Sequence, residues 1–212
     1  MKRIVDKFDK NLIATLPRVA FGGHIEVVIS EKDAKRAVQY LMTQQVLGFD
    51  TETRPSFKQG MQHKVSLLQV STIDTCFLFR LNQMGFPKCL VDLLEDTAIT
   101  KVGLSWHDDL RSLTKRKPFK SGTFVELQDF ASQMGIQDKS LQKLYANIFG
   151  EKISKSQRLS NWETDSLSES QRSYAATDAW ACVKLYEEMM RMQKEGYELI
   201  TTNHEENHTT QG

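Results

Sequence analysis

Two acidic residues stand two positions apart at the end of an apolar run in this 212-residue chain. Asp50 and Glu52 close the segment 46–53, whose apolar start is typical of a buried strand. Residues two apart on a strand point to the same face of a sheet. Like charges at contact distance repel by roughly 1–4 kcal/mol, and a divalent cation between them would remove that repulsion. The pair therefore predicts a cation site, with two solvated acids at a strand end as the alternative.

A third carboxylate is expected on the inward face of a long helix near the C-terminus. Ser168 and Gln171 have the spacing of a capping box, which predicts a helix from 168 to about 194. Its inward stripe contains Tyr174, Asp178, Ala181, Leu185 and Met189. A buried carboxylate is unfavourable unless it is paired, hydrogen-bonded or bound to a metal. Asp178 is thus a candidate ligand, and an aspartate hydrogen-bonded to backbone is the alternative.

A fourth carboxylate comes from the adjacent pair Asp108 and Asp109, and helical spacing separates the two. Asp109 falls within the apolar stripe of the helix predicted over 106–117, which includes Trp106, Leu110 and Leu113. Asp108 aligns instead with the polar residues Ser105, Arg111, Ser112 and Lys115. We therefore expect Asp109 to point inward and Asp108 to be solvated.

Three separate segments thus direct carboxylates toward the interior. Ligand sets made only of oxygen suit hard cations such as Mg²⁺ or Mn²⁺ rather than zinc. Two such ions about 4 Å apart can activate water and stabilise the leaving oxygen of a phosphodiester. The pattern indicates metal-assisted hydrolysis of a phosphodiester.

These residues must be positioned by a mixed α/β sheet. Strands are predicted at 25–29, 46–53, 65–71, 76–81, 99–104 and 123–127. Helices are predicted at 30–45, 86–96, 106–117, 140–149 and 168–194. Strands alternate with helices in the first two-thirds, and the C-terminal third is helical. We expect a lead-in over 1–24, one catalytic domain over 25–195, and a polar, disordered tail over 196–212.

The composition is that of an ordinary globular protein. The net charge of +1 does not by itself indicate a nucleic-acid-binding protein, so any basic groove must be found by position. The cysteines Cys76, Cys89 and Cys182 are odd in number and lack CxxC spacing, which favours reduced, buried thiols. We expect a cytoplasmic protein with no signal peptide and no membrane anchor.

Three segments resemble the motifs of DEDDy-type 3′→5′ exonucleases. They are residues 49–53 (FDTET), Lys101-Val102-Gly103 followed by Asp109-Leu110 and Leu113, and residues 174–179 (YAATDA). Within that family the chain is similar to the Werner-type exonuclease domain, with ribonuclease D a more distant relative. The resemblance spans residues 25–193, and its specificity lies in the three motifs occurring in this order.

The resemblance implies an RNase H-like fold, two catalytic divalent cations (Mg²⁺ or Mn²⁺) and release of nucleoside 5′-monophosphates. It assigns metal binding to Asp50, Glu52, Asp109 and Asp178. It assigns to Tyr174 the orientation of the attacking water. An unperturbed phenol has a pKa near 10, which suits an orienting group better than a general base.

The expected partner is nucleic acid with a single-stranded or recessed 3′ end, as DNA or RNA. Lys155 and Arg158 lie in a segment that resembles the family just before the last helix, and they are candidate phosphate contacts. Thr51, Thr53 and Trp106 are further substrate candidates, although a tryptophan on its helix stripe also suits a core. A second basic group, Arg111, Lys115, Arg116 and Lys117, reads as a solvated surface or a second contact.

Two other functions stay open at this stage. A nucleic-acid-binding module that has lost catalysis would be expected to lack some of the four carboxylates, which are all present. A different RNase H-like enzyme, either an endonuclease or a strand-transfer enzyme, is disfavoured by the Tyr-x-x-x-Asp helix. A closed circular substrate would separate these enzymes from an exonuclease.

Overall fold

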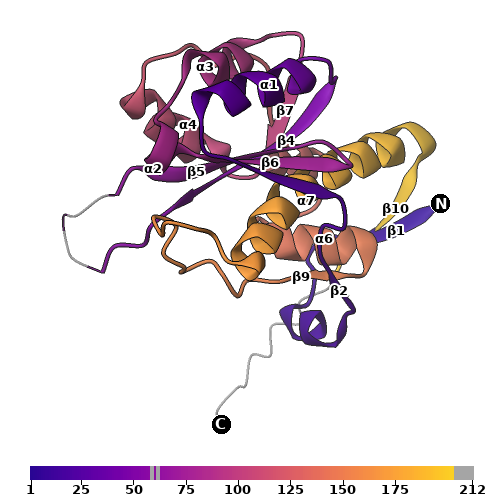
Figure 1. Cartoon of the computed structure of the whole chain (residues 1–212). Coiled ribbons are helices and arrows are strands. Elements are labelled where there is room, and N and C mark those ends of the chain that lie inside the picture. The colour runs from indigo at the N-terminus through magenta and orange to yellow at the C-terminus, as the bar shows by residue number, and fades with distance from the viewer. Residues whose placement is uncertain (58–59, 61–62, 203–212) are drawn as a thin grey trace.

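A six-stranded mixed sheet forms the centre of the protein (Figure 1). The computed structural model describes residues 1–57, 60 and 63–202. The strand order is β3 (His24–Val28), β6 (Thr75–Arg80), β5 (Val65–Ser71), β4 (Val46–Thr53), β7 (Thr100–Gly103) and β8 (Phe124–Glu126). Strand β5 runs antiparallel to β4 and β6, and the other pairs are parallel. The predicted mixed sheet is confirmed.

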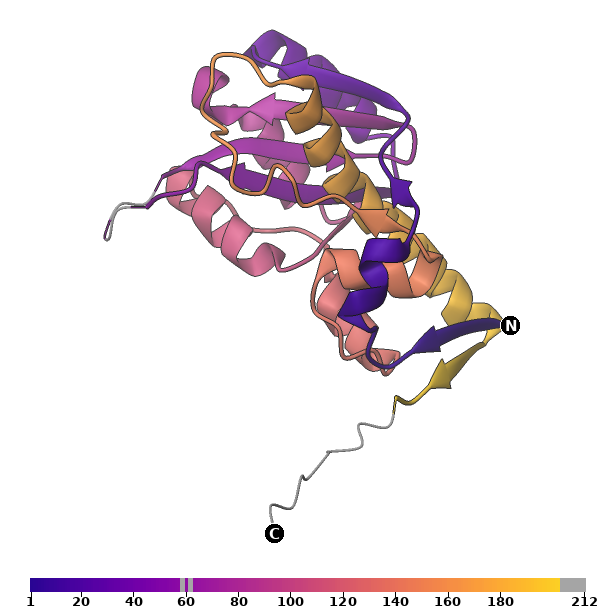
Figure 2. The same cartoon turned by 90° about the horizontal axis from the view of Figure 1, so that it is seen from below.

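Helices cover both faces of this sheet. One face packs against α1 (Glu31–Leu41), α3 (Lys88–Glu95) and α4 (Trp106–Arg116) in a single hydrophobic cluster. The other face packs against α7 (Glu169–Glu195), which runs across β4, β5 and β6 (Figure 2). Helices α5 (Leu127–Gln133) and α6 (Leu141–Phe149) join the C-terminal half of α7 in a second cluster. Between the sheet and the N-terminal half of α7 lies a third cluster, which includes Leu67, Leu78 and Ala176.

Local sequence accounts for where the main helices begin and end. The capping box of Ser168 and Gln171 is present at the start of α7, as predicted. Ser30 caps α1, but that helix ends at Leu41 rather than near Gln45. The correction has a local cause, because the Thr43 hydroxyl donates to the Tyr40 carbonyl and the chain leaves the helix in a tight turn.

Two predicted elements need correction. The helix predicted from Phe86 begins at Lys88, after Pro87 in extended conformation, and the short helix α2 (Leu81–Met84) precedes it. Helix α5 was not predicted, and the strand before it ends at Glu126. The Glu126 carboxylate accepts a hydrogen bond from the Gln128 amide and so caps α5.

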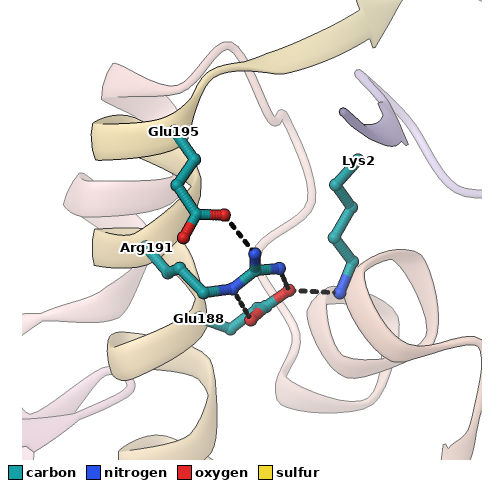
Figure 3. Close-up of polar contacts among 4 residues, drawn as sticks. All are labelled: Lys2, Glu188, Arg191 and Glu195. Carbon is teal, nitrogen blue, oxygen red and sulfur yellow. Dashed lines mark hydrogen bonds and ion pairs between the residues drawn. The ribbon is translucent and has the colours of Figure 1, made fainter.

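The two ends of the described chain pair with each other. Strand β1 (Lys2–Val5) lies parallel to β10 (Tyr197–Ile200) beside the C-terminal end of α7 (Figure 2). Lys2 also contacts Glu188 of α7, and Arg191 bridges Glu188 and Glu195 (Figure 3). The disorder predicted from residue 196 is therefore wrong for 197–200, because pairing with a strand nearly two hundred residues away is not a local sequence signal. Residues 203–212 of that predicted tail lie outside the described residues.

The lead-in over 1–24 is also structured. After β1 it contains the 3-10 helix η1 (Lys10–Thr15) and β2 (Arg18–Val19), which pairs with β9 (Lys152–Ile153). This contact joins the lead-in to the loop that precedes α7. Among the described helices, none combines the length and the apolar character that a membrane crossing requires.

Candidate metal centre and active site

Three carboxylates meet between β4 and α7. Asp50 and Glu52 project from β4 and Asp178 from α7, and one oxygen atom of each lies within 4.8 Å of those of the other two. Both strand residues point to one face of the sheet because they are two apart on β4, as the sequence predicts, and α7 packs on that face. The convergence of these three predicted residues is confirmed, and the set contains only oxygen donors.

Gly48 lets α7 come close enough to complete the cluster. A Cβ atom at this position would lie 1.9 Å from the backbone oxygen of Ala179, which follows Asp178. Gly48 is on the same face of β4 as Asp50, two residues earlier. Close backbone contact at Gly48 therefore sets the distance between the two aspartates. Our sequence reasoning missed this residue, although a glycine inside an apolar strand is a known signal of close backbone approach.

Asp109 approaches β4 from the other side, on α4. The Thr51 hydroxyl donates a hydrogen bond of 2.5 Å to the Asp109 carboxylate. Asp108 points away, with 87% of its side chain exposed and an ion pair to Arg111. The helix-face assignment is confirmed in geometry. Asp109 is near the cluster but is held by Thr51 rather than joined to the three closest carboxylates.

Glu126 fixes the start of the helix that carries Asp109. Ser105 adopts a left-handed backbone conformation with φ 60° and does not cap α4 with its own side chain. The Glu126 carboxylate accepts hydrogen bonds from the amides of Ser105 and Trp106 at 2.9 and 3.2 Å. One buried acid on β8 thus caps both α4 and α5. No sequence signal available to us pointed to this residue.

The carboxylates raise one another's pKa. Burial raises the pKa of Asp50 well above its usual range, and the charges of Asp178, Glu52 and Asp109 raise it further. Burial, then Asp178 and Asp109, raises the pKa of Glu52, while Arg158 lowers it. Burial raises the pKa of Asp109 to about 6, against the hydrogen bond from Thr51. A buried group of acids with these shifts is stable as anions only beside positive charge, which divalent cations would supply.

Tyr174 lies one turn before Asp178 on the same face of α7. Burial raises the pKa of Asp178, whereas the hydrogen bond from the Tyr174 hydroxyl and the charge of Lys155 lower it. Burial and the neighbouring carboxylates raise the pKa of the Tyr174 phenol above its usual value. The ring lies 6.1 Å from that of the fully buried Trp162. Tyr174 is thus a protonated donor at the edge of the cluster.

A cavity of about 290 Å³ opens beside Tyr174 and Asp178. Lys155 and Arg158 line it, together with apolar side chains such as Leu104, Leu141 and Ile153. The two predicted basic contacts therefore lie at the site. A second cavity of about 290 Å³ lies between β3 and α1, but its lining includes none of the clustered carboxylates. The chemistry favours the cavity beside α7.

The other three substrate candidates, Thr51, Thr53 and Trp106, differ in the contacts that their side chains make. Thr51 uses its hydroxyl to hold Asp109, and Thr53 stands at the last position of β4, where the register with β5 shifts. The Trp106 ring stacks with His107 at 4.2 Å and contacts Phe124 at 4.8 Å, packed against the main core. The structure thus favours the packing interpretation of Trp106 over stacking on a base.

The residues of the second basic group, which lie at 111 and 115–117, differ in their contacts. Arg111 is paired with Asp108, and the Lys117 ammonium donates to the Phe86 carbonyl. The Arg116 guanidinium donates to the carbonyls of Val65 and Leu81. Lys115 is exposed and has no ion pair within the described part of the chain.

Comparison with known proteins assigns a family to this arrangement. The sequence profile described as 3′-5′ exonuclease matches residues 25–194. The mouse bifunctional 3′-5′ exonuclease/ATP-dependent helicase WRN is 35% identical over 150 residues, covering 68% of this chain and 11% of that protein. A 3′-5′ exonuclease of Arabidopsis thaliana is 32% identical over 187 residues, covering 80% of this chain and 65% of that protein. This chain therefore spans less than two-thirds of either relative.

A solved structure shares the fold. The crystal structure of the Aedes aegypti Nibbler EXO domain superposes with a TM-score of 0.75 at 20% identity. The superposition covers 82% of this chain and 91% of that domain. The expected RNase H-like sheet, flanked by helices, is confirmed.

Proposed function

The chain belongs to the 3′-5′ exonuclease family, and on that premise we propose that it removes nucleotides one at a time from a 3′ end and releases nucleoside 5′-monophosphates. The observation that carries the proposal is the convergence of Asp50, Glu52 and Asp178 within 4.8 Å, with Tyr174 one turn away. The all-oxygen donor set and the raised carboxyl pKa values suit two divalent cations, Mg²⁺ or Mn²⁺.

Each carboxylate has a distinct place in this proposal. Asp50, Glu52 and Asp178 form the common binding group, and Asp109 completes the site from α4. When bound, two divalent cations activate a water molecule and stabilise the leaving oxygen of the phosphodiester. Asp178 is buried and Asp50 and Glu52 are half-buried, so the three carboxylates are open to a cation from one side only.

Tyr174 orients the attacking water in this scheme. Its phenol stays protonated near neutral pH because burial and the surrounding carboxylates raise its pKa. It can therefore donate a hydrogen bond but does not remove the proton of the water. Its position on the same helix as Asp178 fixes the donor relative to the cation site.

Lys155 and Arg158 supply positive charge on the α7 side. Both line the cavity beside Tyr174, whose volume of about 290 Å³ suits a nucleotide-sized group. We propose that this cavity receives the terminal nucleotide and that the side chains of Lys155 and Arg158 contact its phosphate. A cytoplasmic location is proposed from the three cysteines, which are all unpaired.

The test is hydrolysis of DNA and RNA oligomers labelled at the 5′ end, assayed side by side with Mg²⁺. A ladder that shortens by one nucleotide at a time supports the proposal, and the faster of the two ladders identifies the sugar. A closed circle of the preferred nucleic acid is the control and should resist cleavage. Immediate release of the labelled 5′ nucleotide, or linearisation of the circle, would contradict 3′→5′ polarity.

A further inference from the structure

A third cavity lies between β5 and α4. It has a volume of about 210 Å³ and is lined by His63, Lys64, Val65, Ser112, Lys115 and Arg116. No acid belongs to this lining among the residues that the structure describes. The cavity is therefore a concentration of basic side chains in a protein whose net charge is only +1.

Strand register and helix spacing place this basic cavity near the catalytic carboxylates. Val65 is the register partner of Thr53, the residue that follows Glu52 on β4. Ser112 lies three positions after Asp109, about one turn along α4. The cavity thus lies near the carboxylate site along both β5 and α4.

The positive charge of the basic cavity is not neutralised locally. Lys64 and Lys115 form no ion pair within the described ranges, whereas neighbouring Arg111 is paired with Asp108. Arg116 is held in place by two neutral carbonyls, so its full charge remains. His63 is the exception, because its Nδ1 atom lies 3.4 Å from Glu163. A rigid guanidinium beside two unpaired ammonium groups is suited to a phosphate dianion or diester.

We infer that the basic cavity binds a backbone phosphate of the nucleic acid other than the one being cleaved. The inference rests on the proposed exonuclease function and extends it, because it adds a contact to the nucleic acid beyond the scissile phosphate. That phosphate belongs either to the strand being shortened or to a strand paired with it. Phosphate contacts of this kind position a substrate without reading its sequence.

The test compares the double variant Lys64→Gln/Lys115→Gln with the control Arg111→Gln, which removes a paired cation from the same helix. Binding of labelled oligonucleotides is measured in EDTA, as a function of salt. The double variant should bind about tenfold more weakly, with a salt slope shallower by about 1 to 2. Arg111→Gln should bind like the parent. Hydrolysis of a 5′-nucleotide p-nitrophenyl ester, which spans only the scissile phosphate, should be unchanged in both.

Binding of two different substrates shows which strand carries the phosphate that the basic cavity binds. Weaker binding of both a single strand and a duplex with a recessed 3′ end assigns the phosphate to the cleaved strand. Weaker binding of the duplex alone assigns it to the paired strand. Parent-like binding of both substrates by the double variant overturns the inference, while a parent that hydrolyses neither the oligonucleotides nor the ester with Mg²⁺ would instead contradict the proposed function.

An independent observation concerns Gln69 on β5. The residue is fully buried, and neither its amide nitrogen nor its amide oxygen has a hydrogen-bond partner in the described part of the structure. Buried amides without partners are destabilising and rare. The Gln69 amide is therefore able to donate a hydrogen bond to an acceptor that comes within reach.

Strand register identifies the partner. Gln69 is directly opposite Asp50 on β4 and opposite Leu78 on β6. Directly opposed residues point to the same face, with Cβ atoms roughly 4.5–5.5 Å apart. That face is covered by the alanines of α7 in an apolar cluster that includes Leu67 and Leu78. On the neighbouring strand β4, the polar side chain opposite the Gln69 amide is therefore the Asp50 carboxylate.

We propose that Gln69 is a positioning residue that donates a hydrogen bond to the Asp50 carboxylate when Asp50 holds a divalent cation. Carboxylates that bind metals are usually held by such hydrogen bonds, and loss of one typically weakens metal binding by 10–100-fold. This proposal also rests on the proposed function, since it presumes that Asp50 is a ligand.

The test is Gln69→Leu, with Leu67→Met as a control on the same strand and face. Mn²⁺ affinity is measured by calorimetry, and Tm is measured without metal. We expect Gln69→Leu to weaken Mn²⁺ binding at least about tenfold while the metal-free Tm stays the same or rises. Leu67→Met should leave Mn²⁺ affinity unchanged. Parent-like Mn²⁺ affinity in Gln69→Leu would overturn the proposal, and a lowered Tm beside it would make Gln69 a packing residue. A parent that binds no Mn²⁺ would count against the metal site itself.

Discussion

Asp108 and Asp109 are neighbours in sequence, but α4 turns only Asp109 toward β4. We expect Asp109→Asn to reduce kcat by several orders of magnitude, because it removes a carboxylate from the cation site. Asp108→Asn should retain most of the activity, since its side chain is 87% exposed and pairs with Arg111. The measurement is single-turnover hydrolysis with both variants. Equal and complete loss in the two would sink the assignment.

Tyr174→Phe separates the proposed donor from the packing of its ring. The variant keeps the contact with Trp162 but loses the hydroxyl that reaches Asp178. We expect kcat to fall roughly 10²–10³-fold, as for the loss of one transition-state hydrogen bond. The dependence on Mg²⁺ concentration should stay close to that of the parent, because all four carboxylates remain. A parent-like kcat would show that Tyr174 serves only the core.

At the scale of elements, the approach of α7 to β4 depends on one glycine. Gly48→Ala would place a methyl group against the Ala179 carbonyl, so α7 must move away from β4. We expect a loss of about 1–3 kcal/mol in the free energy of unfolding and a marked loss of activity. Denaturant titration and the hydrolysis assay measure the two effects.

Gly22→Ala is the matched control for this change. A Cβ atom at Gly22 would have no heavy atom within 4 Å, and its backbone lies outside the left-handed region. It should leave both stability and activity near parent values. If Gly48→Ala behaved like Gly22→Ala, close packing of α7 would not be what positions Asp178.

The elements that sequence predicted well are those with local causes. Strands 46–53 and 65–71 have the predicted bounds, because apolar and β-branched runs mark them directly. The inward positions of Asp50, Glu52, Asp109 and Asp178 followed from strand and helix periodicity. Periodicity gives the direction of a side chain within its own element, which is why the carboxylates were found before the fold was known.

What sequence did not predict depends on distant contacts. Glu126 caps two helices, and Gln69 faces Asp50, because of which strands pair and in which register they do so. The pairing of β1 with β10 joins the two ends of the described chain, and it gives a polar segment a structure that its composition does not indicate. These features belong to tertiary structure and have no periodic signal.

At the scale of the whole molecule, the buried acids connect stability to pH and metal. Asp109 has a pKa raised to about 6 from 3.8, and Asp50 and Glu52 are raised too. A carboxyl with a raised pKa holds its proton more tightly in the folded state. Its stabilising contribution is complete below the unfolded pKa and is lost as pH rises through the folded value.

The metal-free protein should therefore lose stability from these groups as pH rises from about 4 to about 9, because the pKa of Glu52 is raised to about 9. Mn²⁺ competes with the protons, so its effect on Tm should be larger at about pH 7.5 than at about pH 5. Calorimetric scans with and without Mn²⁺ at the two pH values measure this difference. An equal increase in Tm at both values would show that Mn²⁺ does not replace protons at these carboxylates.

The most direct test of the central claim is hydrolysis of a 5′-labelled single strand as Mg²⁺ or Mn²⁺ is added, then removed with excess EDTA. The parent should produce a ladder only with the cation present, and Asp178→Asn should produce none at the same concentration. Because Asp178 completes the group of three carboxylates, its loss should abolish turnover while the protein stays folded by circular dichroism. Undiminished shortening of the strand in excess EDTA, or by folded Asp178→Asn, would contradict a metal-dependent site at these carboxylates.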